Sequence, residues 1–316
     1  MTMPPRDFTT FTGKADATDE RDRSIAGNRQ NIFIDRDVDM PEPTAGLFFA
    51  PDSSAGQYLK FERERTRPAA DLLAGVPVFA PNSCIDLGCG PGNSTELLVR
   101  RFPGAAITAL DRSTDMLAAA KRRLPQVHFQ QADLTVWKPD QPYDLIFANA
   151  VLQLLPNHEA LFPWLASLLT PGGYLAAQMP NTLQEPAHVL MRMVAADGPW
   201  SSKLMPVAKS RRRIGTIEDY YGWLTALCGS IDLWHTTYVH PLESVAEIVE
   251  WMMGSGLRPF LNLLEDDQRQ IFLERYKAEI AGAYPSQPDG KVLLRFPTLF
   301  ILARKTVSKA PPSTPE

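Results

Sequence analysis

Short apolar runs alternate with stretches of helical periodicity between residues 83 and 180, and this alternation constrains the fold more than any other feature. The runs that we expect to form strands are residues 83–87, 106–110, 127–130, 143–148 and 174–179. Strands separated by helices of this length pair in parallel through right-handed βαβ crossovers. We therefore predict an α/β protein with a doubly wound, mostly parallel sheet, whose ligand lies beyond the carboxyl ends of the strands.

The rest of the chain is expected to extend this sheet and to cover one end of it. Two later apolar runs are rich in strand-forming residues, although Pro297 in the second run indicates a turn or an edge position rather than a central strand. The stretches around them are mostly helical. The predicted division is a flexible leader at 1–52, a single domain at 53–307 with a cofactor core at 83–180, cap insertions at about 181–228 and 243–285, closing strands at about 231–240 and 292–304, and a disordered tail at 308–316.

Composition excludes several classes of protein. The formal net charge is −4 with acids and bases interspersed, so a broad basic surface for nucleic acid is not expected. The three cysteines have the spacing of neither a disulfide framework nor a zinc site. No run reaches the ~18 to 20 apolar residues of a membrane span, and the first residues lack the apolar core of a signal peptide. We expect a cytoplasmic monomer without a metal site, a nucleic-acid partner or a membrane partner.

The segment at residues 86–95 reads Asp-Leu-Gly-Cys-Gly-Pro-Gly-Asn-Ser-Thr and joins an expected strand to an expected helix. Gly88, Gly90 and Gly92 let the backbone turn tightly and approach a ligand, and the helix start presents free N–H groups. The dinucleotide fingerprint G-x-G-x-x-G/A does not match, because the third glycine comes one residue early and Asn93 takes its place. The loop therefore favours S-adenosylmethionine, which carries no phosphate, over NAD.

Three acidic residues follow expected strands on the same side of the sheet. Asp86 suits the ammonium group of S-adenosylmethionine, while the N–H groups of the loop suit its carboxylate. Asp111 suits the two ribose hydroxyls, and the alternative is a capping aspartate before Ser113, which we expect to cap the helix that follows. Asp133 suits the adenine amino group with Leu134 against the ring, and the alternative is a solvated aspartate in a turn.

The loop and these acids resemble the class I S-adenosylmethionine-dependent methyltransferases. Further segments resemble the trans-aconitate methyltransferases, and the resemblance covers residues 57 to about 305. These segments are residues 58–68, 149–153, 178–180, 185–192, 236–238, 256–259 and 296–300. The resemblance implies a Rossmann-like, seven-stranded sheet with an antiparallel last strand, S-adenosyl-L-methionine as the cofactor, and methylation of a carboxylate of trans-aconitate or a related small polycarboxylate.

The implied reaction asks for positioning rather than acid–base chemistry. A carboxylate is ionised near pH 7 and attacks without a general base, so no catalytic acid or base is predicted. The candidate substrate-binding residues are Tyr58, Gln153, Tyr238, His240 and Arg258. Structural alternatives are a core aromatic for Tyr58, a structural role for His240 and a helix C-terminal contact for Arg258.

Asn149 ends the fourth expected strand, and we assign it to the cofactor site. The prolines and the aromatic residue that base-modifying methyltransferases often carry here are absent, which disfavours a flipped nucleobase as substrate. Three alternatives remain open at this point. They are a methyltransferase for another small acid or hydroxyl compound, an NAD-dependent oxidoreductase, and a binding module that kept the fold without turnover.

Overall fold

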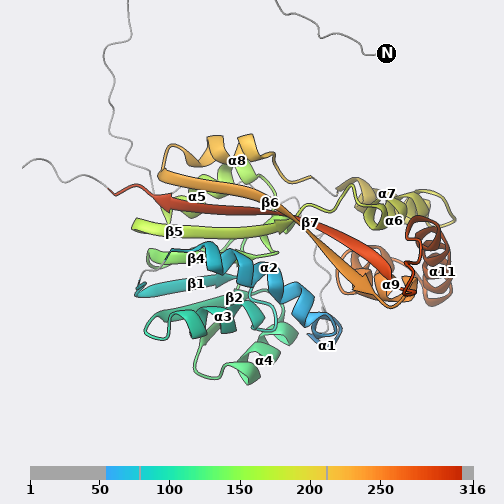
Figure 1. The fold of residues 1–316 in the computed structure, drawn as a ribbon, viewed down its shortest axis with the longest axis horizontal. Helices are drawn as coiled ribbons and strands as arrows, with labels where there is room; N and C mark the ends of the chain where they lie inside the picture. The colour runs from blue at the N-terminus through green and yellow to red at the C-terminus, as the bar shows by residue number, and fades with distance from the viewer. Residues whose placement is uncertain (1–54, 78–79, 211–212, 308–316) are drawn as a thin grey trace, which may run out of the picture. The chain divides into compact units, whose positions relative to one another are not determined.

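A mixed sheet of seven strands organises the residues that this computed structural model describes, 55–77, 80–210 and 213–307 (Figure 1). The predicted leader and tail lie outside these residues. The strands are β1 (Ser83–Leu87), β2 (Ala106–Asp111), β3 (His128–Gln131), β4 (Tyr143–Asn149), β5 (Leu169–Pro180), β6 (Cys228–Leu242) and β7 (Val292–Lys305). Their order is β3-β2-β1-β4-β5-β7-β6, with β1 to β5 parallel and β7 antiparallel to both β5 and β6. The predicted fold class is confirmed.

Helices cover both faces of the sheet, which explains the continuous apolar runs in its central strands. Cys84 and Leu145 pack with helices on one face, whereas their neighbours Ile85 and Ile146 pack with helices on the other. The helices are α1 (Ala55–Leu59), α2 (Glu62–Gly75), α3 (Asn93–Arg101), α4 (Thr114–Arg123), α5 (His158–Ser167), α6 (Pro186–Ala196), α7 (Ser201–Ser210), α8 (Ile217–Leu224), α9 (Val245–Met253), α10 (Arg258–Leu261) and α11 (Asp266–Ala283). The predicted cap of α4 is confirmed, because the Ser113 hydroxyl accepts the N–H of Met116 at 3.3 Å.

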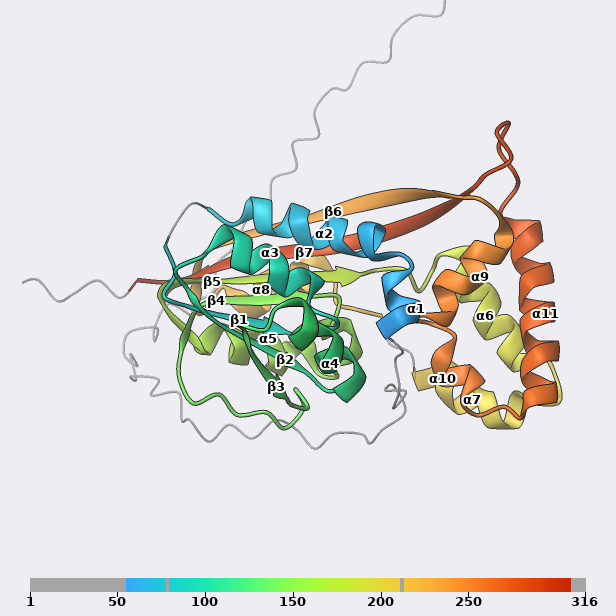
Figure 2. The same cartoon turned by 90° about the horizontal axis from the view of Figure 1, so that it is seen from below.

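A second hydrophobic cluster lies beside one end of the sheet, among α6, α7, α9, α10 and α11 (Figure 2). Large buried side chains fill it, including Trp200, Phe260 and Phe272. Helix α8 differs from these helices, although it falls within the range 181–228 that the sequence assigned to the cap. Its Tyr220 and Leu224 pack in the cluster that contains α5 and the sheet.

Strands β6 and β7 continue past the end of β5 as a two-stranded ribbon toward this second cluster (Figure 2). Pairing of β7 with β5 ends at Thr298, but pairing with β6 continues to Val292. Of the two alternatives for Pro297, the turn is wrong and the edge position is confirmed, because Pro297 continues the strand just beyond the point where pairing with β5 ends. Its carbonyl accepts the N–H of Asn181 at 2.8 Å on the side where β5 ends, so the missing proline N–H breaks no ladder there.

Candidate functional site

A cavity of about 540 Å³ opens beyond the carboxyl ends of β1, β2 and β4. This is where ligands bind in doubly wound sheets. Its wall combines loops of the sheet with α2, with the 3₁₀ turn η1 (Leu152–Leu154) and with the segment after α9. The residues of its wall that the sequence had singled out are Tyr58, Gly88, Gly90, Asp111, Asp133, Leu134, Asn149, Gln153 and Arg258.

The glycine loop shapes the floor of the cavity through left-handed backbone. Gly88 has φ 68°, and a Cβ atom there would come within 2.4 Å of the Val151 side chain, so only glycine fits. Gly90 has φ 54° and nothing within 4 Å of its Cβ position, which leaves its backbone open to a ligand. Gly92 is the N-cap residue just before α3 and faces Ala120 instead of the cavity, so its left-handed backbone serves the turn itself.

Asp86 and Asn93 lie beneath this loop and do not line the cavity. The Asp86 Oδ2 atom accepts the hydroxyls of Ser94 at 2.7 Å and Thr95 at 2.6 Å, whereas Oδ1 is buried without a partner in the described structure. Burial raises the pKa of Asp86 to about 7 even though both hydrogen bonds lower it. Asn93 donates to the Thr66 hydroxyl at 2.8 Å and so ties α3 to α2.

Asp111 presents its carboxylate to the cavity in a fixed orientation. Its Oδ2 accepts the N–H of Gly90 and its Oδ1 accepts the N–H of Ser113, each at 2.8 Å. Burial raises the pKa of Asp111, although these hydrogen bonds act in the opposite direction. Each carboxylate oxygen retains a lone pair, so the group is able to accept two further hydrogen bonds side by side.

Asp133 and Leu134 follow β3 at the edge of the same cavity. Asp133 Oδ1 accepts both the backbone N–H of Thr135 at 3.0 Å and its hydroxyl at 2.7 Å, and Arg112 Nε lies 3.8 Å from Oδ2. Burial acts to raise the pKa of Asp133, but the Thr135 bonds and the Arg112 charge outweigh it and lower the pKa. Asp133 therefore both stabilises the turn after β3 and lines the cavity.

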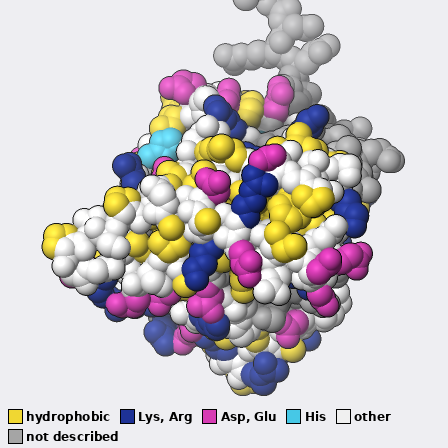
Figure 3. Space-filling model, turned by 90° about the vertical axis from the view of Figure 1, so that its right-hand side faces the viewer, with side chains coloured by type: hydrophobic (Ala, Val, Ile, Leu, Met, Phe, Trp, Pro, Cys, Tyr) yellow, Lys and Arg dark blue, Asp and Glu magenta, His cyan; other side chains and the backbone are white. Residues whose placement is uncertain are grey.

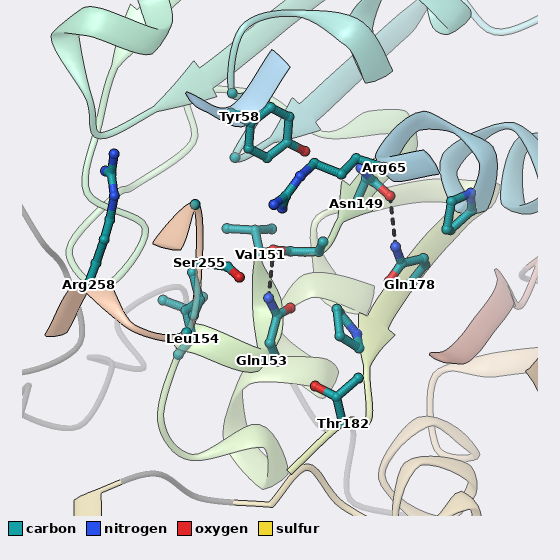
Figure 4. A pocket seen from close by; sticks show the side chains of 18 of the residues that line it. Tyr58, Arg65, Asn149, Val151, Gln153, Leu154, Gln178, Thr182, Ser255 and Arg258 are labelled. Carbon is teal, nitrogen blue, oxygen red and sulfur yellow. Dashed lines mark hydrogen bonds between the residues drawn. The ribbon is translucent and has the colours of Figure 1, made fainter. Parts of the chain in front are cut away.

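Three amide side chains, those of Asn149, Gln153 and Gln178, line the cavity (Figure 4), and Ala150, a residue with strained backbone, lines it as well. Gln178 Nε2 donates to Asn149 Oδ1 at 3.0 Å, and Gln153 Nε2 donates to the Ala150 carbonyl at 2.6 Å. Ala150 has φ 55°, a left-handed conformation that costs about 1–2 kcal/mol for a residue with a Cβ atom. The Oε1 atoms of both glutamines are buried without a partner in the described structure.

Tyr238 and His240 do not line the cavity, so their expected contact with substrate has no support in the geometry. Both are buried on one face of β6, at 3% and 5% exposure. The Tyr238 hydroxyl donates to Asp71 on α2 at 2.7 Å, and the His240 ring stacks on Trp251 with centroids 5.0 Å apart. Residues two apart on a strand share one face of the sheet, and this face of β6 packs on helices.

Arg65 is the most prominent cavity residue that the sequence interpretation missed. Its guanidinium lies over the ring of Tyr58, 4.7 Å from the centroid, and over Trp251 at 4.8 Å. Burial lowers the pKa of Arg65, with Tyr58 and Glu64 acting in the opposite direction. A signal existed, because Arg65 shares a helical face with residues of α2 that are buried. Other missed lining residues are Arg112, Gln178, Thr182, His188, Trp251 and Ser255.

The described part of the chain contains no group of three or more His, Cys, Asp or Glu side chains placed to hold a metal ion. Its cysteines, Cys84, Cys89 and Cys228, are buried and free. Nor does any helix within these described ranges have the length and apolar character to cross a membrane.

Comparison with known proteins decides the family. Residues 84–173 match a family described as a methyltransferase domain. The chain is 58% identical over 255 residues to trans-aconitate 2-methyltransferase of Methylobacterium nodulans, covering 81% of this chain and 99% of that relative. It is 52% identical over 254 residues to the protein of the same name from Rhodopseudomonas palustris strain BisB5, covering 80% and 99%. The chain belongs to the trans-aconitate 2-methyltransferase family.

Family membership confirms the resemblance inferred from the glycine loop and the segments beyond it, and the oxidoreductase alternative loses its support. The fold agrees as well. A solved structure of a putative methyltransferase from Bacillus halodurans superposes with a TM-score of 0.50 at 16% identity, covering 76% of this chain and 100% of that chain. At this identity the likeness supports the architecture alone.

Proposed function

We propose that this protein transfers a methyl group from S-adenosyl-L-methionine to a carboxylate of trans-aconitate, giving a monomethyl ester. The proposal rests above all on the 58% identity with a relative named trans-aconitate 2-methyltransferase over 99% of that relative. This match is much longer than the methyltransferase domain at residues 84–173, so it includes regions that build the rest of the cavity.

The residues around the loop fit S-adenosylmethionine. Asp111 has two oriented oxygens for the ribose hydroxyls, and Gly90 leaves space for close approach of the ligand. Asp86 does not line the cavity, but its negative charge beneath the loop, when ionised, favours an ammonium group above the loop through electrostatic attraction. Asp133 and Leu134 suit the adenine. A cavity of about 540 Å³ lies within the range of small-molecule sites, roughly 300–1,000 Å³.

The chain's own contribution to the reaction is alignment and exclusion of water. When bound, S-adenosylmethionine supplies an electrophilic methyl group on a sulfonium centre. The acceptor carboxylate is ionised near pH 7, so no side chain has to remove a proton. Val151, Leu154 and Phe296 give the cavity apolar surface that keeps water from the attacking oxygen. Polar side chains on the cavity wall that faces the glycine loop then hold the acid in line with the methyl group.

The same proposal includes the setting in which the enzyme works. We propose a monomer in the cytoplasm that acts on a free small acid and not on nucleic acid. The net charge of −4 and the interspersed acidic and basic side chains on the face in Figure 3 favour this substrate class over a polyanion. The three buried free cysteines are consistent with a reducing compartment.

A panel of acids tests the proposal. Purified protein is incubated with S-adenosylmethionine and individual di- and tricarboxylates, and S-adenosylhomocysteine and the ester are quantified by mass spectrometry. We expect trans-aconitate to give the highest kcat/KM. If another acid or a hydroxyl compound is methylated while trans-aconitate is inert, the substrate proposal is wrong. Binding of S-adenosylhomocysteine without turnover of any acid would instead indicate a binding module.

A further inference from the structure

The guanidinium of Arg65 is held in the cavity by two aromatic rings. Figure 4 shows it reaching from α2 toward the space between Tyr58 and Val151. It lies between the rings of Tyr58 and Trp251, and its Nη2 donates to the Trp251 carbonyl at 3.3 Å. A guanidinium that is stacked and bonded in this way loses little further freedom when it binds a ligand.

The same guanidinium lacks an anionic partner. Its Nε is buried with no hydrogen-bond partner in the described structure, and no described carboxylate lies within ion-pair distance of Arg65. Glu64 lines the cavity too, and its charge raises the pKa of Arg65 without forming an ion pair. The Arg65 residue is half-buried, and arginine stays protonated even where burial lowers its pKa, so its charge without an anion is costly here. The site therefore favours an anionic ligand.

The support behind Arg65 continues into the protein as a column of rings. Trp251 is 1% exposed and stacks on His240, which in turn stacks on Tyr238 with centroids 6.3 Å apart. On the other side, a Cβ atom at Gly254 would come within 3.1 Å of the Arg65 Nη2 atom. The pocket around the guanidinium is thus closely fitted, as expected for a preorganised binding group.

We infer that Arg65 binds a carboxylate that the acceptor keeps through the reaction, and that this contact gives the enzyme its preference for polycarboxylates. The inference rests on the proposed function and adds to it the residue that recognises the substrate. A planar guanidinium matches a carboxylate with two parallel hydrogen bonds, and the bound carboxylate would compensate the buried charge. Tyr238 and His240 then act only as support behind Trp251.

The first experiment removes the charge. Arg65→Gln is expected to raise the KM for trans-aconitate about 30-fold, which corresponds to the roughly 2 kcal/mol of a charged hydrogen bond. The Kd for S-adenosylhomocysteine, measured by calorimetry, stays within about twofold, because the loop is untouched. Arg63→Gln makes the same chemical change at an exposed position of the same helix and is the matched control. Its kinetic constants are expected to equal those of the unmodified enzyme.

The second experiment changes the substrate. A dicarboxylate analogue that lacks the contacted carboxylate is expected to lose about 30-fold in kcat/KM with the unmodified enzyme and little more than twofold with Arg65→Gln. Gly254→Ala displaces the guanidinium without removing its charge, and we expect it to raise the KM for trans-aconitate severalfold at unchanged affinity for S-adenosylhomocysteine. Arg65→Lys keeps the charge but not the planar fork and is expected to recover part of the loss.

The outcomes separate this inference from the proposed function. If the unmodified enzyme methylates trans-aconitate and Arg65→Gln keeps its KM and its discrimination between the two acids, the inference is wrong and the function stands. If no trans-aconitate is methylated, the function is wrong. Calorimetry of the tricarboxylate against the S-adenosylhomocysteine complex then decides on Arg65, since binding lost in Arg65→Gln supports the anchor and equal binding or no binding overturns it. Should Arg65→Gln fail to fold, Arg65→Lys and Gly254→Ala give the same decision.

Discussion

The two sides of the cavity are built in different ways. On the sheet side, Asp111 accepts the N–H of Gly90, which is only 21 positions away, and the groups that we assign to the cofactor belong to consecutive βα units. On the other side, Arg65 donates to the carbonyl of Trp251, 186 positions along the chain. The shape of the sheet side therefore depends on local backbone geometry. The shape of the other side depends on contacts between α2 and α9.

With the proposed assignments of Asp111 and Arg65, binding of the methyl donor and binding of the acceptor acid depend on separate contacts. Asp111 has both oxygens oriented by backbone N–H groups before any ligand arrives. Arg65 is oriented by rings and lacks its anion. Changes on the sheet side should therefore alter affinity for the cofactor and stability, while changes near Arg65 should alter the KM of the acid. The following variants test whether this separation holds.

Gly88→Ala should have the largest effect on the sheet side. A Cβ atom would clash with Val151 at 2.4 Å and the left-handed φ of 68° would be strained, so we expect the unfolding free energy to fall by about 3 kcal/mol. Urea unfolding measures this loss. Gly90→Ala is the control, because it has the strain without the clash and should lose only about 1–2 kcal/mol. Equal losses would show that the contact with Val151 does not matter.

Asp111→Asn should have the second largest effect, which is a weaker binding of the cofactor. The amide places an NH₂ group against the N–H of either Gly90 or Ser113, and it removes a charged acceptor. We expect the Kd for S-adenosylhomocysteine to rise about 30-fold, or roughly 2 kcal/mol. At saturating cofactor the KM for trans-aconitate should change less than twofold. A parallel rise in both constants would contradict the separation of the two sides.

The pKa of Asp86 predicts a pH dependence of cofactor binding. With a pKa raised to about 7, the carboxyl group is largely protonated below that pH in the free protein, and an ammonium ligand favours the ionised form. The affinity for S-adenosylhomocysteine should therefore rise up to about tenfold per pH unit between pH 5 and 7 and then level off. Calorimetry across this range measures the slope, which Asp86→Asn should abolish.

The raised pKa of Asp86 also makes the stability of the protein depend on pH, but stability falls with rising pH whereas cofactor affinity rises. The folded-state pKa of Asp86 lies above its ordinary value of 3.8, so the native protein holds this proton more tightly than the unfolded chain does. Its contribution to stability is present below about pH 4 and is lost as the pH rises through 7. The difference in unfolding free energy between the unmodified protein and Asp86→Asn should therefore change with pH in this direction. A difference that stays constant across the pH range would disprove the raised pKa.

Ala150→Gly should have the smallest effect, because it changes only the backbone strain of one residue. Glycine adopts the left-handed φ of 55° without strain, so the unfolding free energy should rise by up to about 1 kcal/mol. Thermal and urea unfolding measure this gain. Ala148→Gly, in the buried interior of β4, is the control and should lose about 1 kcal/mol or more. A loss at both positions would mean that the strain at Ala150 is compensated by packing.

The same contrast explains which features the sequence could predict. The strand 83–87 and the cap at Ser113 were identified correctly, because apolar runs and capping preferences are local properties. Tyr238 and His240 were assigned to the substrate, but they are buried, because the helices that cover their face could not be predicted from the sequence of β6. Arg65 was missed because its two ring partners are brought together only by tertiary packing.

The helices of the second cluster are carried on the edge of the sheet that lies away from the glycine loop. They leave the sheet after β5 and between β6 and β7, while the loop depends on β1 and β2. Insertions or deletions in these excursions are therefore expected to change the acceptor side of the cavity while the glycine loop and the strands that support it stay in place.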